Sequence, residues 1–126
     1  MFVLQIAKAV GAKAIVTSSS DKKIAKAVEE YGAAGGVNYR HTPEWAPEVR
    51  KLTDGQGVDH AFEIGGAGTL LQTIMSVGME GYVHLLGIAL SGAQPDPPTA
   101  AIMAYAIFGA LNVRGFSVSA PSQSFC

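Results

Sequence analysis

The stretch Ala14-Ile15-Val16-Thr17-Ser18-Ser19-Ser20-Asp21 decides the fold, because a short apolar strand there runs directly into a group of helix-capping residues. Serine and aspartate side chains accept hydrogen bonds from the free backbone N–H groups at the start of a helix. The helix that follows is expected to end at Gly32, and a strand at residues 37–39 comes next. The apolar side of this helix consists of Ile24, Ala25, Val28 and Tyr31. A strand, a helix and a second strand in this order predict parallel pairing with a right-handed crossover.

The same alternation of helix and strand extends in both directions from this unit. Upstream, a helix at residues 2–10 is expected to end at Gly11, which provides a left-handed cap. Its apolar face consists of Phe2, Val3, Ile6, Ala7 and Val10. Downstream, we expect a helix at residues 43–52 whose start is delayed by Pro47, because proline inside a helix removes a hydrogen bond. The remaining elements are expected as a turn at 54–57, a strand at 58–64, a helix at 70–77, a strand at 82–86, a helix at 98–110 and a strand at 113–118.

Five strands that alternate with single helices predict one doubly wound α/β domain over residues 1–126, with helices on both faces of a parallel sheet. The chain is long enough to bury a sizeable core, and its 48% hydrophobic and 15% charged residues are typical of a globular protein. In the helix at residues 43–52 we expect Trp45, Val49 and Leu52 to face that core.

The composition argues against several classes of partner. Nine Lys and Arg residues and ten Asp and Glu residues give a net charge of −1, so no positive field attracts nucleic acid or an anionic membrane. The sequence shows no targeting signal and no apolar run of the roughly 20 residues that a membrane span needs. The single cysteine, Cys126, excludes an internal disulfide and favours a reducing compartment, so we expect a cytoplasmic location.

Six short motifs occur along the chain in an order that is specific as a set. They are Leu4-Gln5-Ile6-Ala7-Lys8, Gly11-Ala12, Thr17-Ser18-Ser19-Ser20-Asp21, Asn38-Tyr39-Arg40, Gly55-Gln56-Gly57-Val58-Asp59-His60 and Glu63-Ile64-Gly65-Gly66. Together they resemble the cofactor-binding domain of medium-chain dehydrogenase/reductases, and within that superfamily the zinc-type alcohol dehydrogenase-like and quinone oxidoreductase branch. The resemblance covers nearly the whole chain. It implies an NAD(P)-dependent oxidoreductase that has an additional catalytic domain.

In that family a first strand delivers a glycine-rich turn to the first helix, whose free N–H groups hold the pyrophosphate. Here the helix at residues 2–10 follows Met1 directly, so we expect a partial, Rossmann-derived domain that is not catalytically competent alone. Without strand 1, the order 3-2-1-4-5-6 becomes the flavodoxin-like order 2-1-3-4-5 if the gap closes. Closure would pair residues 14–16 with residues 58–64 and satisfy backbone groups in the middle of the sheet.

A first group of candidate binding residues follows the second strand of the family pattern. There, NAD enzymes of this fold place an acidic residue and NADP enzymes place small or basic residues. By resemblance, a site for the 2′-phosphate of NADP(H), with NAD as the other possible cofactor, would consist of Ser18, Ser19, Lys22, Lys23, Tyr39 and Arg40. The alternative interpretation is a capped turn and a solvated basic face. Asp21 weakens the phosphate interpretation, although it suits a helix cap.

A second group of candidates lies at the expected carboxyl ends of later strands, where ligands bind in open α/β sheets. Gly65 and Gly66 stand between a strand and a helix, at an edge that lies against the cofactor in the similar family. Further residues would, by resemblance, flank the nicotinamide ring and its amide; they are Gly87, Ile88, Phe116 and Ser117. The alternatives are an ordinary strand-to-helix turn and ordinary packing at the sheet edge.

The titratable residues form no catalytic motif, so no catalytic residue is assigned. A lone strand histidine, such as His60 or His84, is usually solvent-facing or hydrogen-bonded, and His41 begins a helix. No Ser/His/Asp or Cys/His set stands out. Without cysteine ligands or a histidine-rich cluster, the zinc of the similar family is not expected in this chain.

Two classes of function remain open. The first is an oxidoreductase domain that binds NADP(H) and depends on another chain for substrate contacts. The second is a non-catalytic scaffold that acts through self-association or partner binding. A weaker third possibility is a mononucleotide site in the flavodoxin-like order. Because Phe2, Val3, Ile6 and the nearly all-apolar helix at residues 100–111 exceed what a small monomer usually exposes, we expect a homo-oligomer, and by resemblance a dimer.

Overall fold

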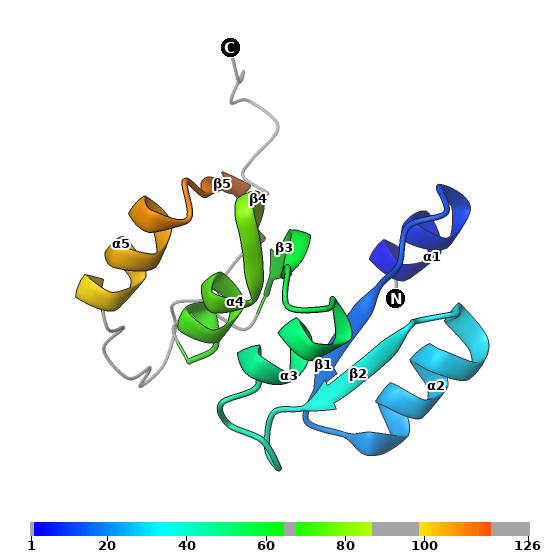
Figure 1. Cartoon of the computed structure of the whole chain (residues 1–126). Helices are drawn as coiled ribbons and strands as arrows, with labels where there is room; N and C mark the ends of the chain where they lie inside the picture. Colours follow the sequence, from blue (N-terminus) through cyan, green and yellow to red (C-terminus); the bar gives the residue numbers. More distant parts are fainter. Residues whose placement is uncertain (1, 65–67, 87–98, 117–126) are drawn as a thin grey trace, which may run out of the picture. The chain divides into compact units, whose positions relative to one another are not determined.

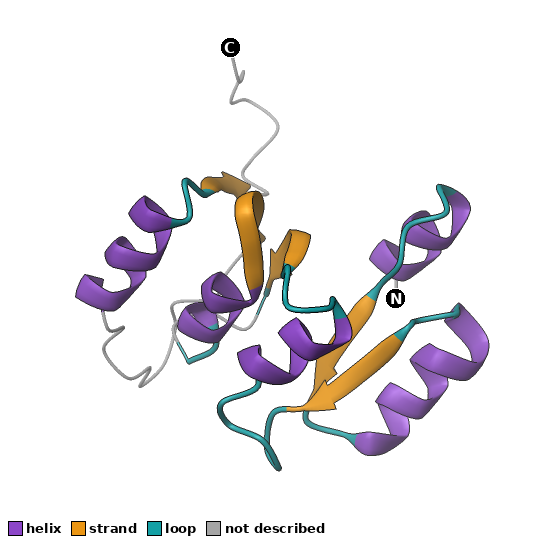
Figure 2. Ribbon diagram, in the orientation of Figure 1, coloured by secondary structure: helices purple, strands orange, loops and turns teal. Residues whose placement is uncertain are grey.

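The computed structural model describes residues 2–64, 68–86 and 99–116, in which helices and strands alternate along the chain (Figures 1 and 2). The predicted alternation is therefore confirmed. In chain order the elements are α1 (Phe2–Ala9), β1 (Ile15–Ser18), α2 (Asp21–Tyr31), β2 (Gly35–Asn38), α3 (Ala46–Leu52), β3 (Val58–Glu63), α4 (Leu70–Ser76), β4 (Val77–Leu86), α5 (Thr99–Phe108) and β5 (Asn112–Phe116).

All strand pairs of the described residues are parallel, which confirms an α/β fold with parallel sheets. β1 pairs with β2, and β3, β4 and β5 form a second sheet in that order. The chain forms two compact units, Met1–Gly55 around the first sheet and Gln56–Cys126 around the second. The predicted pairing of residues 14–16 with 58–64, the flavodoxin-like order and the single domain stay predictions.

In the first unit, the ends of the helices follow the sequence signals closely. Ser20 is the N-cap of α2, and its hydroxyl accepts a hydrogen bond from the backbone N–H of Lys23 at 3.3 Å. Gly32 ends α2 in the left-handed conformation, with φ of 70°, and Gly11 after α1 has φ of 75°. Both glycines adopt a conformation that other residues rarely enter, as predicted.

The core of the first unit uses only some of the apolar residues of its helices. It contains Leu4, Ala27 and Ala33, and Val16 and Tyr31 pack against it. On the expected apolar faces of α1 and α2, Ile6, Val10 and Val28 are exposed, and exposure of Ile6 agrees with the apolar surface expected on the first helix. These helices carry apolar residues on more than one side, so the sequence pattern alone does not select the side that packs.

Helix α3 begins at Ala46, with Pro47 in its first turn, so the expected delay by proline is confirmed. Trp45 and Val49 are buried, as predicted. Leu52, however, is half exposed, at 51%. It occupies the last position of α3, where the helix ends and no further turn covers the side chain.

The second unit has its core on one face of the β3-β4-β5 sheet. Ile74, Val77 and Val83 are buried there, and Ile102 of α5 and Leu111 pack against them. Strand β4 begins five residues earlier than predicted, because α4 passes into Val77 without a connecting loop. In the sequence, Gly78 and Gly81 suggest that the strand has not yet begun. In the structure they lie within it and allow close backbone contact between neighbouring segments.

Candidate functional site

The carboxyl end of β1 forms a tight turn built by serine hydroxyls. The Ser18 hydroxyl accepts a hydrogen bond from the backbone N–H of Ser20 at 3.2 Å, and Ser20 caps α2. Lys22 and Lys23 follow in the first turn of this helix, and both side chains are exposed. The turn therefore places two cations beside the positive end of the helix dipole.

The parallel pairing of β1 with β2 brings the second part of this group to the same sheet end. Ser18 stands opposite Asn38 in the register, and the backbone N–H of Tyr39 donates to the Ser18 carbonyl at 3.1 Å. The backbone N–H of Arg40 donates to the Asn38 side-chain oxygen at 2.9 Å. The six residues of the first predicted group, Ser18, Ser19, Lys22, Lys23, Tyr39 and Arg40, thus lie on two adjoining segments.

Three residues near this group were not predicted as part of it, namely Asp21, Asn38 and His41. The Asn38 side-chain amide donates to an Asp21 carboxylate oxygen at 2.9 Å, and the other Asp21 oxygen lies 3.8 Å from Nδ1 of His41. Asn38 therefore links the turn after β1 to the turn after β2 through its side chain. The sequence signal that could have revealed this link is Asn38 directly after the buried Val37, at a strand end.

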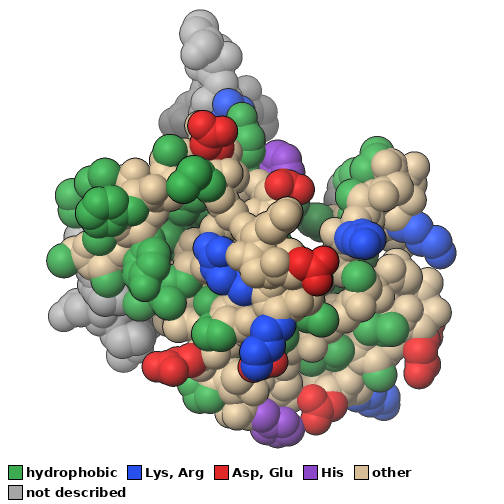
Figure 3. Space-filling model, in the orientation of Figure 1, with side chains coloured by type: hydrophobic (Ala, Val, Ile, Leu, Met, Phe, Trp, Pro, Cys, Tyr) green, Lys and Arg blue, Asp and Glu red, His purple; other side chains and the backbone are tan. Residues whose placement is uncertain are grey.

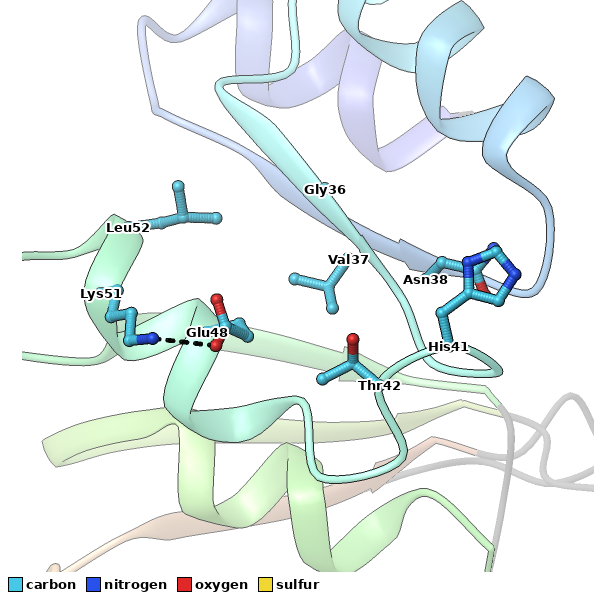
Figure 4. Close-up of a pocket in the computed structure, with 8 residues that line it drawn as sticks. All are labelled: Gly36, Val37, Asn38, His41, Thr42, Glu48, Lys51 and Leu52. Carbon is cyan, nitrogen blue, oxygen red and sulfur yellow. Dashed lines mark hydrogen bonds and ion pairs between the residues drawn. The ribbon is translucent and has the colours of Figure 1, made fainter.

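A hollow of about 370 Å³ lies between β2 and α3 in the same unit (Figure 4). Asn38 and His41 belong to its lining, so it adjoins the group at the sheet end. On α3, Glu48 and Lys51 face it as an ion pair of 3.0 Å. The polar side chains named here are already engaged with protein partners, and the hollow by itself selects no ligand.

Most of the second predicted group lies outside the described residues. The members outside are Gly65, Gly66, Gly87, Ile88 and Ser117. Phe116 is described as the last residue of β5, at a carboxyl strand end, as expected. At the end of β3, the carboxylate of Glu63 is buried and accepts hydrogen bonds from the hydroxyls of Thr69 (2.6 Å) and Thr73. These bonds fasten α4 to the end of β3.

The two strand histidines are neighbours, although they are separate in the sequence. Nδ1 of His60 on β3 lies 3.1 Å from Nε2 of His84 on β4. Partial burial, followed by the charges of His60 and Arg114, lowers the pKa of His84 below its ordinary value. Among the residues that the structure describes, no group of three histidine, cysteine or acidic side chains could hold a metal ion.

The geometry of a capped turn at a parallel sheet end agrees with the comparison with known protein families. The sequence model of the family described as zinc-binding dehydrogenase matches residues 1–125. The chain belongs to this family. Its match supports the predicted membership in the medium-chain dehydrogenase/reductase superfamily, as the cofactor-binding domain of alcohol dehydrogenase-like and quinone oxidoreductase-like proteins.

Individual members of the family support the same assignment. A zinc-type alcohol dehydrogenase-like protein of Schizosaccharomyces pombe is 38% identical over 123 residues, covering 97% of this chain and 35% of that protein. A solved NAD-dependent alcohol dehydrogenase is 32% identical with a TM-score of 0.72, covering 89% of this chain and 31% of that one. The quinone oxidoreductase of Escherichia coli, solved with NADPH, is 26% identical with a TM-score of 0.73, covering 90% and 33%.

The chain therefore spans about a third of the length of these relatives. The family is described as zinc-binding, but the described residues contain no group of three side chains that could hold a metal ion. In the described part of the chain, no helix has both the length and the apolar character to cross a membrane.

Proposed function

We propose that this chain is the cofactor-binding domain of an NAD(P)-dependent oxidoreductase and that the sheet end at Ser18 and Asn38 takes the adenosine side of NADP(H). The observation that carries the proposal is the β1-β2 pairing, which brings serine, lysine and arginine residues together at one carboxyl sheet end. Ligands of open α/β sheets bind at such ends. A cytoplasmic location belongs to the same proposal and rests on the sequence alone.

The site offers suitable chemistry for a 2′-phosphate. Lys22 and Lys23 supply positive charge at the start of an eleven-residue helix, where free N–H groups and the helix dipole favour an anion. Arg40, on the adjoining segment, could add a charge-assisted hydrogen bond. The Asp21 carboxylate opposes an anion, but one of its oxygens accepts the Asn38 amide. We therefore propose NADP(H) as the preferred cofactor, with NAD(H) weaker.

The bound cofactor would supply hydride chemistry, and this chain's residues would bind and orient its adenosine end. The relatives are about three times as long as the chain, so the substrate contacts of the whole protein are proposed to come from outside residues 1–126. We accordingly propose that the chain alone binds the cofactor without reducing or oxidising a substrate.

The test is a calorimetric titration of the folded chain with NADPH and, separately, with NADH. Lys22→Glu combined with Tyr39→Phe should weaken NADPH binding at least about tenfold, a loss of about 1.4 kcal/mol, and should weaken NADH binding less. Lys13→Glu is the matched control, because Lys13 is an exposed lysine in the same unit before β1. Equal losses for both cofactors, or an equal loss in the control, would refute the phosphate assignment.

A second candidate function, a non-catalytic scaffold that self-associates, is favoured by the apolar surface of α5. Met103, Tyr105, Ile107 and Phe108 are exposed on this helix, Phe108 at 82%. Hydrophobic side chains gather over α5 in the space-filling view (Figure 3). Surfaces of this kind commonly mark protein interfaces. If neither cofactor binds while the chain associates, this second function replaces the first.

A further inference from the structure

One face of the β3-β4-β5 sheet carries ring side chains that the proposed function does not use. Side chains alternate between the two faces of a sheet along each strand. Ala61, Val83 and Leu85 belong to the core beneath α4 and α5, so the residues between them point to the opposite face. The register places these side chains on neighbouring strands: His60, Phe62, Tyr82, His84 and Arg114.

The two histidines of this face are held between aromatic neighbours. His60 stacks on Tyr82, with ring centroids 5.0 Å apart and planes 12° apart. His84 stacks on Phe62, with centroids 4.8 Å apart and planes 21° apart. Each imidazole therefore packs against an aromatic ring, and the two imidazoles lie side by side without a metal ion.

The distance between the facing nitrogens suits a shared metal ion. Late transition metals bind imidazole nitrogen at about 2.0–2.1 Å, so two nitrogens on one ion lie about 2.9–3.4 Å apart for bond angles from about 90° to tetrahedral. Nδ1 of His60 and Nε2 of His84 are 3.1 Å apart, and their ring centroids are 5.4 Å apart. An ion bound to both nitrogens would lie off the line that joins them, so each ring would turn its lone pair by about 40° to reach the ion.

We propose that His60 and His84 form a two-histidine site for a divalent late transition metal ion, Cu²⁺ or Zn²⁺, with water in the remaining positions. Imidazole suits both ions, and the usual order of affinities places Cu²⁺ above Zn²⁺. The described part of the chain offers no group of three such ligands, so it contributes two imidazoles to the ion. The inference does not depend on nicotinamide binding.

Metal binding needs both facing nitrogens without a proton. In the metal-free pair, one neutral ring donates its N–H to the lone pair of the other. On binding, that proton moves through water to the other nitrogen of its own ring, so each ring stays neutral and no proton is lost.

A positive charge near the two histidines limits their affinity for a metal ion. The Arg114 guanidinium lies 5.6 Å from the centroid of the Tyr82 ring, on the same face of the sheet. Its positive charge opposes a second cation. We therefore expect reversible binding of one ion per chain rather than an ion on which folding depends.

The experiment is a calorimetric titration of the chain at pH 7.5 with CuCl₂, ZnCl₂ and MgCl₂, in a Cys126→Ser background that removes the thiol. Cu²⁺ should bind saturably at one ion per chain, Zn²⁺ more weakly, and Mg²⁺ not detectably, since Mg²⁺ prefers oxygen ligands. His60→Ala and His84→Ala should each weaken Cu²⁺ binding at least about tenfold, because even the loss of an outer-shell partner has that effect.

His41→Ala is the matched control, because His41 is the one remaining histidine and lies in the other unit. It should leave Cu²⁺ binding unchanged, and the electron paramagnetic resonance spectrum of the Cu²⁺ complex should show nitrogen coupling that His60→Ala alters. Circular dichroism shows whether each variant is folded. Absence of saturable Cu²⁺ binding, or equal loss in all three histidine variants, would overturn the proposal.

Discussion

Gly57 lies where two backbone segments of the second unit approach each other closely. It has φ of 84°, and a Cβ atom there would lie 2.6 Å from the Gly78 nitrogen and 2.9 Å from the Ser76 carbonyl oxygen. Both neighbours are backbone atoms that cannot rotate away. The position therefore requires glycine for two independent reasons, its positive φ and its lack of a side chain.

Gly57→Ala should lower the free energy of unfolding by about 2 kcal/mol or more, because it adds a steric overlap to the strain of positive φ. Gly55→Ala is the control: Gly55 also has positive φ, at 81°, but nothing lies within 4 Å of its added Cβ. It should cost only about 1 kcal/mol. Urea denaturation measures both values, and equal losses would show that the close contact with Gly78 has no energetic weight.

At the scale of single elements, the sequence predicted caps and turns better than packed faces. The Ser20 cap and the Gly32 end of α2 depend on local chemistry, which neighbouring residues determine. The early start of β4 and the exposure of Val28 depend on tertiary packing, which local patterns do not contain. For the same reason, the serine and lysine candidates after β1 were found, whereas the Asn38–Asp21 link was not.

The contact between His60 and His84 was missed on similar grounds, since it arises only when β3 and β4 pair in this register. Twenty-three residues separate the two histidines in the sequence. No motif joins them, so each was treated as a lone strand histidine. Only the cross-strand register shows that they act as a pair.

The pairing of β3 with β4 predicts a pH dependence of stability. The pKa of His84 is lowered in the folded chain by burial and by the charges of His60 and Arg114, so the unfolded chain binds the proton more readily. Neutral His84 makes its full contribution to the free energy of unfolding above pH 6.5, the ordinary pKa of histidine. This contribution declines as the pH falls toward the lowered pKa of the folded chain. Stability should therefore rise with pH in the range just below 6.5.

The measurement is the urea midpoint of the metal-free chain between pH 5 and pH 7.5. His84→Gln should reduce the slope of stability against pH in that range. His41→Gln should keep the slope, because His41 lies in the other unit, beside Asp21. An unchanged slope in His84→Gln would show that the lowered pKa of His84 does not contribute to the pH dependence.

At the scale of the whole molecule, the exposed apolar residues of α5 bear on how the chain behaves in solution. Ile107 is 71% exposed and Phe108 is 82% exposed, at the end of a helix with no charged residue. Exposed side chains of this size are unfavourable in water, and covering them against another molecule returns roughly 25 cal/mol per Å² of apolar surface. This argument supports self-association through α5, the basis of the second candidate function.

Ile107→Ser combined with Phe108→Ser should therefore shift the chain toward monomer, with a dimer dissociation constant raised at least about tenfold, as expected when central apolar contacts are lost. Met79→Ser is the matched control, because Met79 is 79% exposed in the same unit but lies on β4. Sedimentation velocity over a range of concentrations measures the three proteins. Since α5 lies apart from the Ser18 sheet end in the sequence, the α5 variant should still bind NADPH if the cofactor proposal holds. A wild-type chain that is monomeric throughout, or an equal effect of Met79→Ser, would contradict association through α5.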